Sequence, residues 1–332
     1  ADPSLLYALN RGGASLIDVA SERQRVAVVN LLRARENPAR RRLVETESLE
    51  AWLAARGLAA LTNALADIAD DPDDLREMTD DDVVDALEAV ANEFSESNAN
   101  LMTMKADVTD RDAMEDAATR TLAAFGKVHV VCNNAGVAVS GNIADMTYQD
   151  WDWVTRVNLD GVANGVVSFV NRIREHGEGG HFVNTASIAG QFGMQGLSVY
   201  NATKFAVVGM SEAMRQDLAP DNIGISVLCP GFVATNIFTS QRNRPDALGG
   251  PDAAGFGAGI TDGMSNATPE QQQMLASMLD PSVIGDMVLH AIQNDIFYIL
   301  SHGDFREQLT ARGQEIAGSF DLWSAWREEH GV

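Results

Sequence analysis

The sequence has few of the residues that mark secreted, membrane or metal-dependent proteins. Its 332 residues include only two cysteines, Cys132 and Cys229, and both lie within apolar runs. We therefore expect buried, reduced thiols, no disulfide framework and a cytoplasmic location. No run of about 18 apolar residues and no signal-peptide pattern occurs, which argues against membrane insertion. The six histidines show no paired spacing with cysteines or carboxylates, so no metal site is predicted.

Basic residues are also scarce. The chain has 24 Lys and Arg against 47 Asp and Glu, a net charge of −23. The net charge therefore argues against nucleic acids and anionic membranes as partners, because both require clustered positive charge. Acidic residues are concentrated in residues 67–96, where Arg76 is the single basic residue. This segment lacks the central glycine of an EF-hand loop, so an acidic, solvated helix start is favoured over a calcium site.

From about residue 100, short apolar runs alternate with longer amphipathic stretches. The runs have the length and β-branched content of buried strands, and they lie at 100–110, 127–136, 179–187, 224–231 and 296–300. The stretches at 110–125, 150–176, 199–219 and 281–294 have the length of helices. Such alternation predicts a Rossmann-like, doubly wound parallel sheet in a three-layer α/β/α domain spanning residues 1–332. Ligands are expected at the carboxyl ends of its strands.

Two regions depart from this alternation. Residues 232–280 are rich in glycine and poor in strand signals, and we interpret this insertion as a substrate loop or lid. Residues 1–99 form an atypical first portion of the domain. "RVAVVN" (25–30) and "LTNALADIA" (61–69) are its candidate strands, and "ESLEAWLAARG" (47–57) is its candidate helix.

The stretch "SVYNATKFAVVGM" (198–210) carries the clearest chemistry. Tyr200 and Lys204 are four residues apart, so a helix places them on one face, one turn apart. An ammonium group beside a phenol stabilises the phenolate and lowers its pKa from about 10, which suits proton transfer. The alternative is a core tyrosine beside a solvated lysine. It is disfavoured because the chain has only three lysines against 21 arginines.

Other polar residues are predicted at the same edge of the sheet. Ser187 ends the strand in "NTASIAG", thirteen residues before Tyr200. "NNAG" (133–136) ends another strand, and Asn158 lies within a helix that flanks the sheet.

Together these motifs resemble the short-chain dehydrogenase/reductase family. "CNNAG", "RVNLDGVANG", "NTASIAG", "YNATK" and "LCPGFVAT" occur in the family's order, over about residues 100–310. A narrower likeness, in "YQDWDWVTRVNLDGVANGVVSFV" and "FYILSHGDFREQL", is to members that oxidise bulky hydrophobic or aromatic secondary alcohols, such as the lignin-derived Cα-alcohol dehydrogenases.

The resemblance implies an NAD- or NADP-dependent oxidoreductase that interconverts a secondary alcohol and a ketone. Tyr200 would be the general acid and base, Lys204 would lower its pKa and hold the nicotinamide ribose, and Ser187 would bind the substrate oxygen. Asn158 would hold a water in the proton relay. The matching cofactor contacts are Asp107 and Val108 for adenine, Asn134, Ala135 and Gly136 beside the adenine ribose, and Pro230, Gly231, Val233 and Thr235 for the carboxamide. Relatives pair the helices at 150–176 and 199–219, which here are apolar on more than one face, so a homodimer or homotetramer is expected.

One family feature is missing. The sequence has no T-G-x-x-x-G-x-G turn to approach the cofactor diphosphate; "RGGASLID" (11–18) is nearest, with Leu16 and Asp18 in place of glycines. If "RVAVVN" is the first strand instead, five arginines between 33 and 42 could bind phosphate or form a solvated basic face. Asp67 would then end the second strand and favour NAD over NADP. The alternative function is a cofactor-poor, non-catalytic relative that serves binding or assembly.

Overall fold

The computed structural model describes residues 15–20, 28–31, 100–250 and 277–332. Several expectations lie outside these residues. They are the elements predicted at 47–57 and 61–69, the arginines at 33–42, Asp67, and residues 251–276 of the predicted substrate loop.

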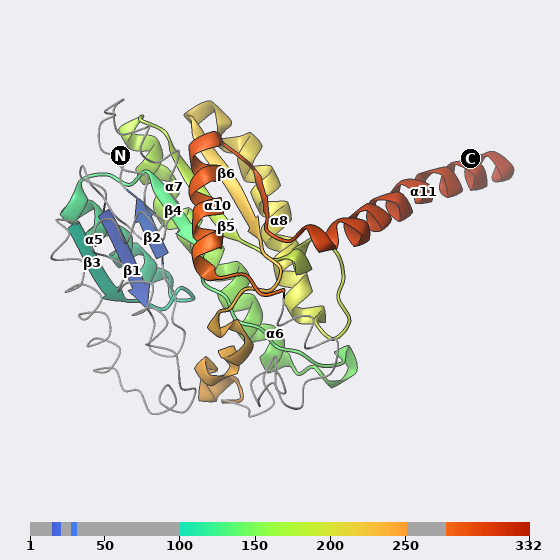
Figure 1. Ribbon diagram of the computed structural model, residues 1–332, viewed down its shortest axis with the longest axis horizontal. Coiled ribbons are helices and arrows are strands. Elements are labelled where there is room, and N and C mark those ends of the chain that lie inside the picture. The colour runs from blue at the N-terminus through green and yellow to red at the C-terminus, as the bar shows by residue number, and fades with distance from the viewer. Residues whose placement is uncertain (1–14, 21–27, 32–99, 251–276) are drawn as a thin grey trace.

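The centre of the molecule is a parallel sheet, as predicted. Its strands β4 to β7 pair in parallel in chain order and form the middle and one edge of the sheet (Figure 1). Their bounds are Val130–Asn133, Gly180–Thr185, Ile223–Cys229 and Tyr298–Leu300. β4 is buried along its whole length, and most of β5 and β6 is buried as well. Helices therefore cover both faces of these strands, and polar side chains can reach a ligand only at the strand ends.

The other side of the sheet differs from the expected parallel arrangement. β1 (Ser15–Ala20) pairs in parallel with β3 (Asn100–Lys105), whereas β2 (Val28–Leu31) pairs antiparallel with β4. β1 and β2 lie between β3 and β4 (Figure 1). Two expectations are corrected: residues 15–18 of the glycine string belong to a strand, and the strand at "RVAVVN" runs in the opposite direction to a first Rossmann strand. Only residues 21–27 connect β1 to β2, too few for the crossover that parallel strands need.

Helices lie on both faces of the sheet. α7 and α8 pack against β4, β5 and β6 on one face, and α10 covers β5 and β6 on the other (Figure 1). The bounds are α5 Arg111–Phe125, α6 Tyr148–Thr155, α7 Gly161–His176, α8 Ser198–Leu218, α10 Pro281–Asn294 and α11 Arg306–His330. Asp280 caps α10 by accepting a hydrogen bond from the Ser282 N–H at 2.8 Å. None of the helices in the described ranges is long and apolar enough to cross a membrane.

Two helical features were not predicted. The single helix expected over 150–176 is divided into α6 and α7 by a π-helical turn at Arg156–Asp160. α11 extends away from the body of the molecule, and none of its residues is buried (Figure 1).

The core lies between the sheet and its helices. Trp153, Phe169 and Phe182 are fully buried there. Cys132 and Cys229 are both free and buried, as expected.

Candidate active site

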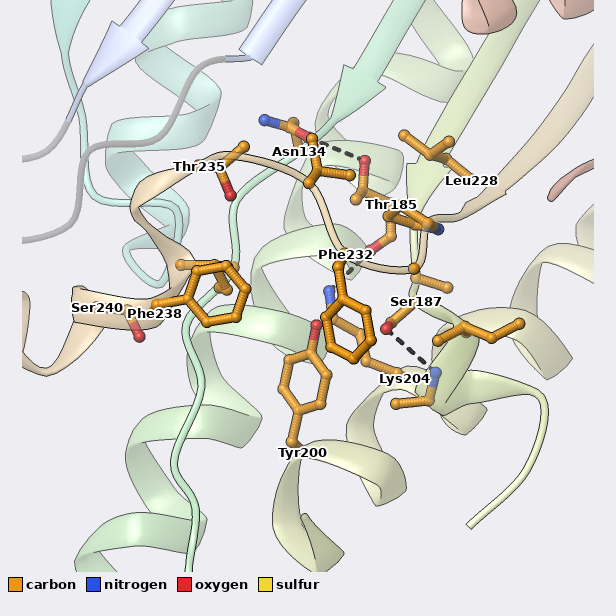
Figure 2. A pocket seen from close by; sticks show the side chains of 18 of the residues that line it. Asn134, Thr185, Ser187, Tyr200, Lys204, Leu228, Phe232, Thr235, Phe238 and Ser240 are labelled. Carbon is orange, nitrogen blue, oxygen red and sulfur yellow. Dashed lines mark hydrogen bonds between the residues drawn. The ribbon is translucent and has the colours of Figure 1, made fainter. Parts of the chain in front are cut away.

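A cavity of about 340 Å3 opens at the carboxyl ends of β5 and β6 (Figure 2). Its residues come from the loops after β4, β5 and β6, from the start of α8 and from α10. Ser187, Tyr200 and Lys204 lie together on its wall. The sequence therefore placed these three side chains correctly at one edge of a doubly wound sheet.

Ser187 is held at the end of β5 by its own turn. Its backbone is extended, and its Oγ accepts a hydrogen bond from the Ala189 N–H at 3.1 Å, which caps the short 3-10 turn Ile188–Gly190. The Ile188 N–H donates to the carbonyl of Pro230 at 2.8 Å. These bonds tie the end of β5 to the loop after β6 and direct the serine toward the cavity.

Tyr200 and Lys204 share one face of α8, as their spacing predicts. The Lys204 Nζ donates a hydrogen bond to the carbonyl of Thr185 at 2.8 Å and lies 5.6 Å from the centroid of the Tyr200 ring. Both side chains are buried, and Lys204 is only 2% exposed. Asn201 holds the preceding loop in place, because its Nδ2 donates to the carbonyl of Phe192 at 3.0 Å. Because the Lys204 side chain is buried, the alternative of a solvated lysine is wrong.

Burial dominates the electrostatics of this pair. It raises the pKa of Tyr200 to about 12, and the hydrogen bond that the phenol oxygen accepts from Ser187 offsets this only in part. Burial also lowers the pKa of Lys204 to about 8, although the nearby Cys229 acts in the opposite direction. The expected lowering of the Tyr200 pKa is not found in this structure, because desolvation disfavours the charged phenolate.

The side chain of Asn158 has a different set of partners from those expected. It lies in the π-helical turn and is fully buried. Its Oδ1 accepts from the Val137 N–H at 2.8 Å, and its Nδ2 donates to the Val137 carbonyl at 2.9 Å and to Thr203 Oγ1 at 3.2 Å. Asn158 thus fixes the loop after β4 to α8, and its side chain is not part of the cavity wall. Its role in a proton relay stays a prediction.

The expected cofactor residues divide into two groups. The cavity wall includes Asn134, Gly136, Pro230, Gly231, Val233 and Thr235. It does not include Asp107, Val108 or Ala135. Asp107 instead accepts a hydrogen bond from the Thr109 N–H at 2.8 Å, just after β3. The structure therefore gathers the residues assigned to the carboxamide and two of the three assigned beside the adenine ribose, and the roles of all of them stay predictions.

Several residues of the cavity wall were not predicted from the sequence. Thr185 connects two of the predicted ones: its carbonyl accepts from Lys204 and its Oγ1 donates to Asn134 Oδ1 at 3.1 Å (Figure 2). Phe232 and Phe238 lie within the segment predicted as a substrate loop. The position of these two in that loop was the only signal that could have identified them.

The comparisons agree with this geometry. The sequence profile of the family described as "short chain dehydrogenase" matches residues 77–246, more than half of the chain. The chain is 30% identical over 237 residues to a CLA biosynthesis dehydrogenase/reductase of Lactiplantibacillus plantarum, covering 70% of this chain and 80% of that protein. It is 32% identical over 221 residues to a C alpha-dehydrogenase of Sphingobium sp., covering 64% of this chain and 68% of the relative.

Solved structures support the same assignment. A short chain dehydrogenase/reductase from Burkholderia phymatum, solved in complex with NAD, superposes with a TM-score of 0.61 at 31% identity, covering 71% of this chain and 83% of that one. The relative named C alpha-dehydrogenase also accords with the narrower resemblance to Cα-alcohol dehydrogenases. The chain belongs to the short-chain dehydrogenase family.

Proposed function

We propose that this chain is an NAD(P)-dependent oxidoreductase that interconverts a secondary alcohol and a ketone. The observation that carries the proposal is the joint placement of Ser187, Tyr200 and Lys204 on the wall of one cavity. Family membership supports oxidoreductase chemistry that depends on NAD or NADP. In ketone reduction the Tyr200 hydroxyl would donate a proton to the carbonyl oxygen, and in alcohol oxidation the phenolate would accept it.

The neighbouring groups would assist this proton transfer. Ser187 hydrogen-bonds the Tyr200 side chain in the free protein, and when substrate binds its single O–H would donate to the substrate oxygen instead. Lys204 holds a positive charge near the phenol at neutral pH, which favours the phenolate as it forms. A raised Tyr200 pKa keeps the phenol protonated in the free protein, so the resting state is prepared for ketone reduction.

The cavity fits the nicotinamide end of the cofactor. Gly136 lies beside the catalytic groups, where a Cβ would be in van der Waals contact with Lys204 Nζ at 3.5 Å and with Asn158 Oδ1 at 3.6 Å. Thr235 and the Pro230–Gly231 turn line the same space. When bound, the nicotinamide supplies or accepts the hydride that accompanies the proton carried by Tyr200. We favour NAD over NADP, and this preference depends on Asp67.

The walls of the cavity favour a bulky hydrophobic or aromatic substrate. Apolar side chains form much of the lining beyond the polar groups: Ile188, Met194, Leu197, Phe232, Ile237 and Phe238. A volume of about 340 Å3 lies within the usual range for small-molecule sites. An aryl secondary alcohol would place its hydroxyl between Ser187 and Tyr200 and its ring against Phe232.

The N-terminal strands favour a second candidate, a cofactor-poor protein that binds or assembles without catalysis. β2 pairs antiparallel with β4, although a doubly wound nucleotide-binding sheet has a parallel strand beside it. The sequence also lacks the glycine-rich turn that brings backbone amides to the diphosphate.

Calorimetric titration with NAD and NADP, followed by an assay on aryl secondary alcohols, separates the two candidates. We expect measurable dinucleotide binding and turnover in the native chain. Tyr200→Phe should reduce turnover at least 100-fold with cofactor affinity nearly unchanged, because only the proton is lost. Absence of binding to either dinucleotide would favour the non-catalytic candidate. A Tyr200→Phe protein with most of its native rate would refute the role of Tyr200.

A further inference from the structure

A second cluster of functional side chains lies at the opposite edge of the sheet. His129 directly precedes β4, His176 is the last residue of α7, and Glu178 lies two residues before β5. One nitrogen of each histidine and one carboxylate oxygen of Glu178 all lie within 4.8 Å of one another. The sequence spacing predicted no metal site, because His129 is almost fifty residues from the other two and only the fold brings them together.

The hydrogen bonds of His176 leave one ring nitrogen, Nδ1, unprotonated. Its Nε2 lies 2.7 Å from the carbonyl oxygen of Val128, which can only accept, so Nε2 carries the proton. Nδ1 is then unprotonated, and its one lone pair accepts a 3.2 Å hydrogen bond from the Glu178 N–H, which a bound metal ion would replace. A histidine whose other nitrogen donates to a backbone carbonyl has the arrangement found in most metal-binding histidines.

His129 and Glu178 complete the set of donors. The His129 Nε2 lies 2.8 Å from Glu178 Oε2, and the two imidazole rings have centroids 4.5 Å apart. Lys127 pairs with the other carboxylate oxygen, Oε1, so Oε2 alone faces the histidines. His129 is 2% exposed, whereas the Glu178 side chain is half exposed and is held by its pairing with Lys127 and His129.

We propose that His129 Nε2, His176 Nδ1 and Glu178 Oε2 bind one Zn2+ or similar divalent transition-metal ion, with water as the fourth ligand. Two imidazoles and one carboxylate are a donor set that zinc accepts, and ligand atoms around tetrahedral zinc lie about 3.4 Å apart. The longest separation, at most 4.8 Å, must therefore shorten by up to about 1.4 Å, and the 2.8 Å between His129 Nε2 and Glu178 Oε2 must lengthen, so the side chains of His176 and Glu178 both have to adjust. Binding would release the proton that His129 shares with Glu178.

The site would be structural rather than catalytic. It lies at the amino ends of β4 and β5, whereas Ser187 and Tyr200 lie beyond the carboxyl end of β5. An ion there would join the end of α7 to the starts of two central strands.

Titration of the full chain with ZnCl2, followed by calorimetry and by thermal unfolding, tests the proposal. We expect one Zn2+ per chain with a Kd in the micromolar range or tighter, and a rise in the unfolding midpoint at excess Zn2+. With Co2+ in place of Zn2+, visible absorption bands should report coordination by nitrogen and oxygen. His176→Gln and Glu178→Gln should each weaken Zn2+ binding at least 30-fold, whereas His290→Gln, at an exposed histidine on α10, should leave it unchanged.

Two results would overturn the proposal. One is no Zn2+ or Co2+ binding to the native chain at millimolar concentration. The other is binding that survives both His176→Gln and Glu178→Gln in proteins whose circular dichroism matches that of the native chain.

Discussion

The same cause shifts the two titrating side chains of the cavity in opposite directions. Burial favours the neutral form of both, so the pKa of Tyr200 rises to about 12 and that of Lys204 falls to about 8. The ammonium of Lys204 is thus retained near pH 7 at a cost in stability. A charge kept in a buried site despite this cost is typical of a functional group rather than a packing residue.

Replacing Lys204 should reveal this cost. A pKa lowered from 10.5 to about 8 corresponds to about 3 kcal/mol of lost stability while the lysine is charged in both states. Loss of the hydrogen bond to Thr185 destabilises the variant by about 1 kcal/mol and so offsets part of this gain. We expect Lys204→Met to be more stable than the native chain by about 2 kcal/mol at pH 7, measured by urea unfolding.

The stability difference between Lys204→Met and the native chain should depend on pH. The unfolded chain binds more protons at Lys204 than the folded chain between pH 8 and 10.5, so native stability should rise with pH across that window. The advantage of Lys204→Met should therefore be constant below pH 8 and shrink toward pH 10. Lys127→Met, at a half-exposed position, is the control and should change stability by less than about 1 kcal/mol. A Lys204→Met protein that is less stable than native at pH 7 would contradict the prediction.

At the scale of elements, the sequence predicted what depends on local pattern. β4, β5, β6 and α8 carry apolar runs whose period and length define them, and Ser187, Tyr200 and Lys204 follow because they sit at fixed places on those elements. The direction of β2 could not be predicted, because an apolar run fits a parallel or an antiparallel strand equally well. The direction depends on the length of the connection between β1 and β2. The cluster of His129, His176 and Glu178 was missed for a similar reason, since these residues meet only when β4 and β5 lie side by side.

The contact between α7 and β4 depends on one glycine. A Cβ at Gly165 would lie 2.0 Å from Asn133 Oδ1, and Asn133 is held in place by donating to Asn184 Oδ1 at 2.8 Å. We expect Gly165→Ala to destabilise the protein by about 1–3 kcal/mol through overpacking, measured by the midpoint of urea unfolding.

Gly209 supplies the matched control on α8. A Cβ there has no atom within 4 Å, so Gly209→Ala should be neutral or stabilise the chain by up to about 1 kcal/mol through helix propensity alone. If both alanine variants unfold at the same urea concentration, the close approach of α7 to β4 does not control stability.

At the scale of the whole molecule, the apolar surface indicates a second copy. Much of the apolar face predicted on α7 is internal, since Val162 and Phe169 are buried within the chain, but Val167 is 68% exposed. α11 adds Phe320 and Trp323, which are 73% and 59% exposed on a helix without any buried residue. Single exposed apolar residues are common, but several large ones on a projecting helix favour an interface.

We therefore expect light scattering to show a homodimer or homotetramer at micromolar concentration. Because each chain carries a net charge of −23, copies repel at low ionic strength, and association should strengthen between 0.05 and 0.5 M NaCl as salt screens that repulsion.

The double variant Phe320→Glu and Trp323→Glu should shift the protein toward monomer, since it adds charge to the apolar surface that a second copy would cover. Glu328→Gln, on the same helix, is the control and should leave the assembly intact. A native chain that is monomeric at both salt concentrations would refute the prediction. Val167 and α11 would then be exposed to solvent in the protein in solution.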